Sequence, residues 1–298
     1  NITFEKSKNT FVNSAGYFIN IGTYNNHQPH VTFDNCKFSY MESNAHGGGS
    51  IGLWLRGSSE SIYMNLTFVN TTFEHLQFQN AATDRNPQGW GAISSNKLVS
   101  NNNFDLYVIG CTFNNVSSLI SGGAIQFSNK NRQMHVEDSK FIGTKTINAN
   151  QKGGAIHAQA HDSSHPIVIK NCYFENTRPF KPNFVLSLTI SISNCEFTQS
   201  SSSSEGQAIY ITGSVLDQIT ISFCTFTNCG TNNSLASLYL DAYNFQFLNN
   251  EVTFSSSSSS CGCVKALHAS SHIYKNNLFK NSRQNNEWTS AGIHETSP

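Results

Sequence analysis

The sequence predicts an all-β chain that winds as a single strand path into a parallel β-solenoid, and three observations lead to this fold class. Short segments alternate between apolar and polar residues at a period of two, which is typical of strands. Turn-forming residues bound these segments, and Asn and Ser together make up roughly a quarter of the 298 residues. Two short phrases recur along the chain in a fixed order, as in repeat proteins.

The first phrase reads apolar, any residue, Asn or Asp, Cys or a small polar residue, any residue, Phe. Its copies are Phe33–Phe38, Phe68–Phe73, Val108–Phe113, Val136–Phe141, Ile169–Phe174, Ile192–Phe197, Ile221–Phe226, Phe247–Val252 and Tyr274–Phe279. The last position returns about every 30 residues, within the range of repeat arrays. We expect its Phe residues to stack in one column through the core. We expect the Asn or Asp residues to form a second column at a left-handed bend, where their amides meet.

The second phrase falls between copies of the first and reads small, small, Ala or Ser, aliphatic. Its clearest copies are Gly122–Ile125 and Gly153–Ile156. Strict alternation around the aliphatic residue predicts an inward row. Its expected members are Ile51, Ile93, Ile125, Ile156, Ile209, Leu238, Leu267 and Ile293.

These columns predict one continuous domain over residues 1–298, with about ten rungs of three short strands each. Successive rungs would lie about 4.8 Å apart, which gives a rod about 50 Å long. The chain begins at Asn1 and ends at Pro298 in the middle of its pattern, so we expect a segment of a longer protein.

The alternation of Gly-Gly-Ala-Ile with Asn-Cys-x-Phe resembles the repeats of chlamydial polymorphic membrane proteins and of related protist surface proteins. Gly122–Ile125 and Gly153–Ile156 carry the resemblance most clearly. The resemblance implies a right-handed parallel β-helix of the pectin-lyase type. It also implies a cell-surface location and a role in adhesion.

Cysteine usage separates into two groups. Cys36, Cys111, Cys172, Cys195 and Cys224 share one slot of the first phrase with Ser and Thr, which predicts small, buried thiols. Cys229, Cys261 and Cys263 break that pattern and are expected in loops of adjacent rungs. They predict a disulfide from Cys229 to either Cys261 or Cys263. A zinc site with His268 is the weaker alternative, because the spacing matches no common zinc module.

Five N-glycosylation sequons start at Asn1, Asn65, Asn70, Asn115 and Asn232. Together with the expected disulfide they favour a secreted or cell-surface glycoprotein.

Charge and composition exclude some functions. Lys and Arg number 18, and so do Asp and Glu, so there is no basic surplus to bind nucleic acid. No apolar run is long enough for a membrane span. Polysaccharide cleavage requires paired carboxylates, but the outward stripe beside the aliphatic row contains a single acid, Asp241. No catalytic residue, metal or cofactor is therefore assigned. The cluster His157, His161, Asp162 and His165 is interpreted as structural.

The same stripe carries flat rings among amide and hydroxyl groups, which suits glycans or a protein receptor. The ligand-binding candidates are Trp54, His157, Tyr210, Tyr239 and His268. The leading hypothesis is a non-enzymatic extracellular β-helix that acts as a rigid structural or adhesive module and whose open ends stack into fibres. The alternative is a carbohydrate-active enzyme of the pectin-lyase type, either a polysaccharide lyase or a glycoside hydrolase.

Overall fold

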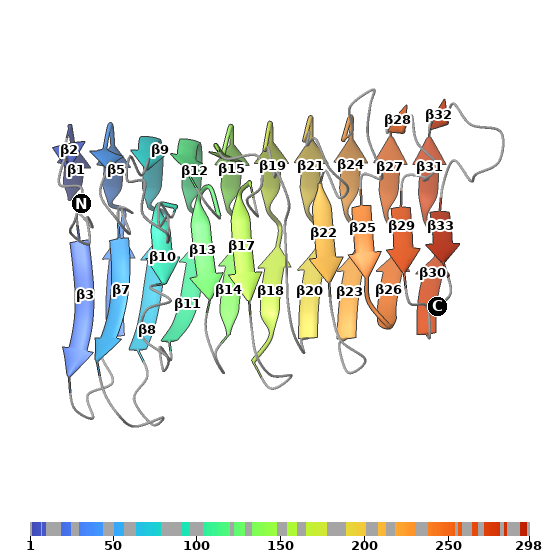
Figure 1. The fold of residues 1–298 in the computed structure, drawn as a ribbon, viewed down its shortest axis with the longest axis horizontal. Coiled ribbons are helices and arrows are strands. Elements are labelled where there is room, and N and C mark those ends of the chain that lie inside the picture. Colours follow the sequence, from blue (N-terminus) through green and yellow to red (C-terminus); the bar gives the residue numbers. More distant parts are fainter. Residues whose placement is uncertain are drawn as a thin grey trace.

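The chain forms parallel sheets of many strands in a computed structural model. The structure describes residues 2–6, 8–9, 19–24, 30–43, 51–56, 64–78, 91–95, 104–119, 122–128, 133–147, 154–159, 165–177, 189–200, 208–212, 218–229, 238–253, 256–257, 264–267, 271–280, 283–284 and 293–296. Within these residues there are strands and no helix. In each sheet the strands stand side by side along the long axis, from the N-terminal to the C-terminal end (Figure 1). This all-β architecture is consistent with the predicted solenoid.

Sheet A is the largest sheet, with 13 strands. Its main path is β1 (Thr3–Glu5), β5 (Lys37–Ser39), β9 (Thr72–Phe78), β12 (Thr112–Ser118), β15 (Lys140–Ile142), β19 (Tyr173–Glu175), β21 (Glu196–Thr198), β24 (Thr225–Thr227), β27 (Glu251–Thr253) and β31 (Leu278–Lys280). Three short strands pair off this path: β2 (Lys8–Asn9), β6 (Glu42–Ser43) and β16 (Lys145–Thr146).

Sheet C has nine strands, and one of them precedes each strand on the main path of sheet A from β5 onward. They are β4 (His30–Asp34), β8 (Met64–Val69), β11 (Phe104–Ile109), β14 (Met134–Glu137), β18 (Ile167–Lys170), β20 (Thr189–Ser193), β23 (Gln218–Ser222), β26 (Asn244–Leu248) and β30 (Ser271–Lys275).

The remaining strands form two sheets and one short pair. Sheet B contains β3 (Ile19–Tyr24), β7 (Ile51–Arg56), β10 (Ile93–Ser95), β13 (Ile125–Ser128) and β17 (Ile156–Gln159). Sheet D contains β22 (Ile209–Thr212), β25 (Leu238–Asp241), β29 (Val264–Leu267) and β33 (Ile293–Thr296), and the short pair is β28 (Ser256–Ser257) with β32 (Arg283–Gln284). Below, one passage of the chain through sheet C, sheet A and then sheet B or D is called a rung.

The predicted Phe column is confirmed. Phe141 stacks on Phe174 with ring centroids 4.8 Å apart and planes 5° apart, and Phe174 stacks on Phe197 at 4.7 Å and 4°. Similar stacking runs from Phe4 to Phe226 along sheet A. Strand spacing sets this distance, because parallel in-register strands place identical residues directly above one another.

The predicted bend column is also confirmed. Its residues have the left-handed backbone that Asn and Gly tolerate best. They are Asn35, Asn70, Gly110, Asp138, Asn171, Asn194, Phe223, Asn249 and Asn276. Amides within the column bond as expected, since Asn171 Nδ2 donates to Asp138 Oδ1 at 3.0 Å and Asn276 Nδ2 donates to Asn249 Oδ1 at 3.1 Å.

A second bend column, which we did not predict, lies two residues after the Phe column. Its left-handed residues are Lys6, Tyr40, His75, Asn115, Gly143, Asn176, Gln199 and Asn228. The backbone N–H of a bend residue donates to a carbonyl of the next rung, as from Tyr40 to Glu74 O at 3.1 Å. These bonds hold the bends in register whatever side chain they carry. The second bend lies within sheet A, since β9 and β12 continue past His75 and Asn115.

The aliphatic row needs one correction. Ile51, Ile93, Ile125 and Ile156 align in sheet B as predicted. In sheet D, however, Leu238 aligns with Val264 and then with Ile293, so the prediction for Leu267 was wrong. Val264 is fully buried and is therefore an inward residue of β29. It takes the position in the row that the sequence phrase had assigned to Leu267, three residues later.

Candidate functional site

The predicted ligand stripe lies along sheets B and D, and the structure describes part of it. β7 carries Trp54 and β22 carries Tyr210, but the side chains of these two residues lie outside the described part of the chain, as does all of His268. His157 is only 6% exposed. It aligns with Gln126 on the neighbouring strand, and Gln126 aligns with Ser94; both of these residues are also buried. The ring of His157 therefore does not lie on the open surface that we expected for it.

Tyr239 is half-buried and has a cationic neighbour. It aligns with Lys265, whose Nζ lies 5.3 Å from the centroid of the Tyr239 ring. Lys265 occupies the row position that the sequence phrase assigned to His268, because β29 is in a different phase. A cation over an aromatic face stabilises both side chains and reduces the ring area available to a sugar.

A polar network on the outer face of sheet C was missed at the sequence level. Gln133 Nε2 donates to Tyr107 Oη at 2.7 Å, and His135 Nε2 lies 3.4 Å from Gln133 Oε1. The Tyr107 and His135 rings stack with centroids 5.3 Å apart. The backbone N–H of Gln133 donates to Asp105 Oδ1 at 3.4 Å. These residues meet because β11 and β14 are adjacent and in register, which no local motif reveals.

The protonation of this network follows from its surroundings. Burial lowers the pKa of His135, and the nearby carboxylates of Glu137 and Asp105 oppose this only in part. The ring is therefore neutral at pH 7, with a hydrogen on Nε2 for Gln133 Oε1 and a lone pair on Nδ1. A neutral imidazole beside a phenol can accept a proton or a hydrogen bond from a ligand hydroxyl.

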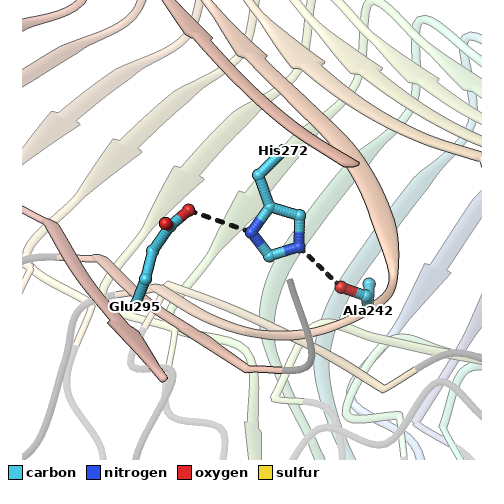
Figure 2. A network of polar contacts seen from close by, with 3 residues as sticks. All are labelled: Ala242, His272 and Glu295. Atoms are coloured by element: carbon cyan, nitrogen blue, oxygen red, sulfur yellow. Dashed lines mark hydrogen bonds and ion pairs between the residues drawn. The ribbon is translucent and has the colours of Figure 1, made fainter. Parts of the chain in front are cut away.

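The last rung holds a second polar cluster, shown in Figure 2. His272 Nε2 donates to the carbonyl of Ala242 at 2.8 Å, and His272 Nδ1 lies 3.0 Å from Glu295 Oε1. Both acceptors are satisfied only when the ring carries two N–H hydrogens. Tyr274 packs edge-on to His272, and burial, with a smaller effect of Glu295, raises the pKa of its phenol. This cluster ties β30 to β33 and to the turn before β26.

The shared cysteine slot is a hydrogen-bonding column. Cys36, Cys111, Cys172, Cys195 and Cys224 are buried free thiols, as predicted. Each thiol donates to the carbonyl two residues before it, as from Cys111 to Ile109 O at 3.4 Å. Ser139 occupies the same slot and accepts the backbone N–H of Cys111 at 3.1 Å. Burial raises the pKa of Cys111 to about 11, so its thiol stays protonated and unreactive.

Cys229 lies after β24 and outside the strands, as expected for a loop residue, but it is not on the surface. It is fully buried one residue after the second bend column, and its Sγ lies 3.3 Å from Phe197 O. Burial raises its pKa to about 12. Cys261 and Cys263 lie outside the described residues, so the disulfide stays a prediction.

Two sequons fall at exposed bends. Asn70 lies in the first bend column and Asn115 in the second, and both are exposed. Asn65 is half-buried on β8, with its Nδ2 3.0 Å from His30 Nδ1. Asn1 and Asn232 lie outside the described residues. Glycosylation stays a prediction at all five positions.

The described ranges lack two kinds of feature. They contain no candidate for a membrane-spanning helix. In the same ranges no three His, Cys, Asp or Glu side chains are grouped so that they could hold a metal ion.

Comparison with known proteins gave no relative. No family model matches the chain, and no curated protein or solved structure matches it. The resemblance to the chlamydial repeats therefore stays an expectation that rests on the quoted residues.

Proposed function

We propose that the chain is a right-handed parallel β-helix of about ten rungs, three short strands each, that serves as a rigid, non-enzymatic module at a cell surface or outside the cell. The observation that carries this proposal is the aromatic column from Phe4 to Phe226, whose neighbouring rings are 4.7 to 4.9 Å apart. Bending such a stack would separate rings and break sheet hydrogen bonds on one side. The module therefore suits a spacer or an adhesive support.

Two further features support an extracellular setting. Asn70 and Asn115 are exposed sequon residues at bends, and the Asn115 amide nitrogen lies 3.5 Å from His75 Nδ1. The five slot thiols are buried, and a buried protonated thiol resists oxidation in an oxidising compartment.

Assembly through the ends belongs to the same proposal. Among the described strands, the outermost ones of sheets A and C are β1 and β4 at one end and β31 and β30 at the other, and each pairs on one side only. Such edges accept further strands, either from more of the same chain or from a second copy. Continuing the Phe column from one copy to the next would place Phe279 over Phe4.

Surface labelling and adhesion test the proposal together. Protease added to intact source cells should digest the chain. Beads coated with the purified chain should bind cells or extracellular matrix. Enzymatic removal of N-linked glycans should reduce the mass of the native protein. Detection of the chain only inside intact cells would overturn the extracellular role.

A carbohydrate-active enzyme is the second candidate, and the network on β11 and β14 favours it. Neutral His135, with Tyr107 beside it and Asp105 nearby, has the groups needed for general acid and base catalysis. Release of reducing ends or unsaturated products from a polysaccharide panel tests this candidate. Its loss in His135→Ala, with a retained β-sheet circular dichroism spectrum, would establish the enzyme and overturn the non-enzymatic role.

A further inference from the structure

A groove opens on the outer face of sheet C toward its C-terminal end. It encloses about 510 Å³ over three neighbouring strands, β23, β26 and β30. Its outward side chains are Gln218, Thr220, Asn244, Gln246, Ser271 and Ile273. The volume lies within the range of ligand-binding sites, and the groove is separate from the stripe on sheets B and D that the sequence indicated.

Strand register arranges the lining in two rows. Thr220, Gln246 and Ile273 align across the three strands, and each is two residues beyond a member of the second row. Neighbours within a row lie about 4.8 Å apart, and the rows lie about 7 Å apart along the strands. The floor is therefore a regular grid of hydrogen-bonding groups, which can follow a chain of linked sugar rings.

The chemistry of the lining indicates a neutral ligand. None of the described lining residues is charged. The amides of Gln218 and Gln246 can both donate and accept, and neither forms a side-chain hydrogen bond within the described part of the protein. Ile273 is 45% exposed and adds a small apolar surface. A sugar offers hydroxyl groups at its rim and C–H groups on its faces, which match this combination.

The other half of the same face has a different character. Its outward residues include the charged or titratable side chains Asp34, Asp105, His135, Glu137 and Lys170. The uncharged lining is thus confined to the groove itself, because the exposed Lys275 lies two residues beyond Ile273 on the same face of β30. An acidic polysaccharide would find no cation among the described lining residues to pair with its carboxylates.

Phe223 adds an independent observation. It follows β23 directly, has a left-handed φ of 55°, and is 60% exposed. The same bend position is Asn194 in the rung before and Asn249 in the rung after, both suited to that backbone. A bulky ring held in an unfavourable conformation and left in solvent indicates that the ring is used.

We propose that this groove binds a neutral oligosaccharide. The two polar rows hydrogen-bond to sugar hydroxyls, and Phe223 stacks on a further ring beyond the end of β23. The inference rests on the proposed adhesive role and names the class of ligand for it.

Calorimetric titration of the purified chain tests the groove. The probes are neutral hexasaccharides of glucose, xylose, mannose and N-acetylglucosamine, with hexagalacturonate as the acidic comparison. At least one neutral probe should bind with a Kd between about 10 μM and 1 mM. The double variant Thr220→Ala, Gln246→Ala should weaken binding by about tenfold or more, since it removes hydrogen bonds to the sugar. The matched control is Thr67→Ala, which alters the same residue type in the same row on β8, outside the groove.

Phe223→Asn tests the ring separately. It should raise the melting temperature by relieving the backbone and at the same time weaken binding of the neutral probe. A higher melting temperature with unchanged binding would overturn the role of the ring.

Failure of the groove and failure of the proposed function give different results. Three results would show that the groove is not the binding site and would leave the proposed function untouched. They are no binding of any neutral probe at about 10 mM, tighter binding of hexagalacturonate, and equal losses of affinity in the double variant and the Thr67→Ala control. Binding followed by cleavage of the probe would keep the ligand class and overturn the non-enzymatic role.

Discussion

The inward columns of sheet C are apolar through the interior of the molecule and polar in the last rung. One column runs Leu66, Leu106, Met134, Ile167, Ile190, Ile219 and Phe245, all buried, and then reaches His272. The next column ends on Tyr274, and a column of sheet D passes from Leu240 and Ala266 to Glu295.

The difference shows how far the side chains inside a rung can vary while the backbone pairing between rungs stays the same. The last rung pairs with the rung before it in the same parallel register that interior rungs use, so the side chains decide whether the interior is closed by apolar packing or by polar residues. In the interior a lone polar group would be costly. In the last rung His272 contacts Glu295 and the carbonyl of Ala242, so a polar pair replaces apolar packing there.

The largest expected effect separates an interior ring from a terminal one. Phe141→Ala removes a fully buried ring between Phe113 and Phe174, and should destabilise the protein by about 3–5 kcal/mol. Phe279→Ala removes a half-buried ring in the last rung and should cost roughly half as much. Urea unfolding followed by circular dichroism measures both, and equal costs would show that the two regions do not differ.

The hydrogen-bonding slot gives the next effect. Ser139→Ala removes the buried acceptor for Cys111 N–H and the donor to the part-buried Glu137 O, and should cost about 1–3 kcal/mol. Asn277→Ala breaks similar bonds in the half-exposed last rung and should cost less, because water replaces them. Ser139→Cys is the matched control, since Cys fills this slot in five other rungs. A cost for Ser139→Cys as large as for Ser139→Ala would contradict the role of the hydrogen bonds.

A double-mutant cycle on His272 and Glu295 should show a smaller effect. His272→Val alone leaves Glu295 without its partner, and Glu295→Leu alone leaves the imidazole with one acceptor. The two changes together restore apolar columns, so the pair should show a coupling of about 1 kcal/mol. Additive costs in thermal unfolding would mean that the cluster is not a unit.

The smallest effect concerns an exposed pair that joins the last rung to its neighbour. Lys280 Nζ donates to Glu251 Oε1 at 2.9 Å, and this bond is the main cause that lowers the pKa of Glu251. A lowered carboxyl pKa stabilises the fold above the unfolded-state pKa, and the contribution disappears as pH falls through the folded-state pKa. Lys280→Ala should raise the pKa of Glu251 in an NMR titration, and Lys280→Arg should preserve it. An unchanged value in Lys280→Ala would rule out the pair as the cause.

The columns could be predicted from sequence where one residue type repeats. Phe at the end of the first phrase and Asn at its third position are such cases, because the core and the left-handed bend each restrict the choice. The second bend column escaped prediction because Tyr40, His75 and Gln199 share only a backbone conformation. The register of Lys265 escaped because the phrase around β29 runs out of phase with its neighbours.

The candidate sites were less predictable for a related reason. Tyr107 and His135 lie 28 residues apart and meet only through strand pairing. Outward positions in a solenoid vary freely, so no repeat marks them. His272 could have been noticed as a polar residue on an otherwise apolar alternation, two positions before Tyr274. That signal requires aligning sheet C strand by strand.

The two bend columns on either side of the Phe column make the molecule modular in length. Each bend is closed by backbone bonds to the adjacent turn of the chain, and these bonds do not depend on which turn it is. Inserting one more copy of the unit would therefore lengthen the particle by about 4.8 Å and create no new type of contact. Duplication of the repeat in the gene would therefore change the length of the protein in steps of one rung.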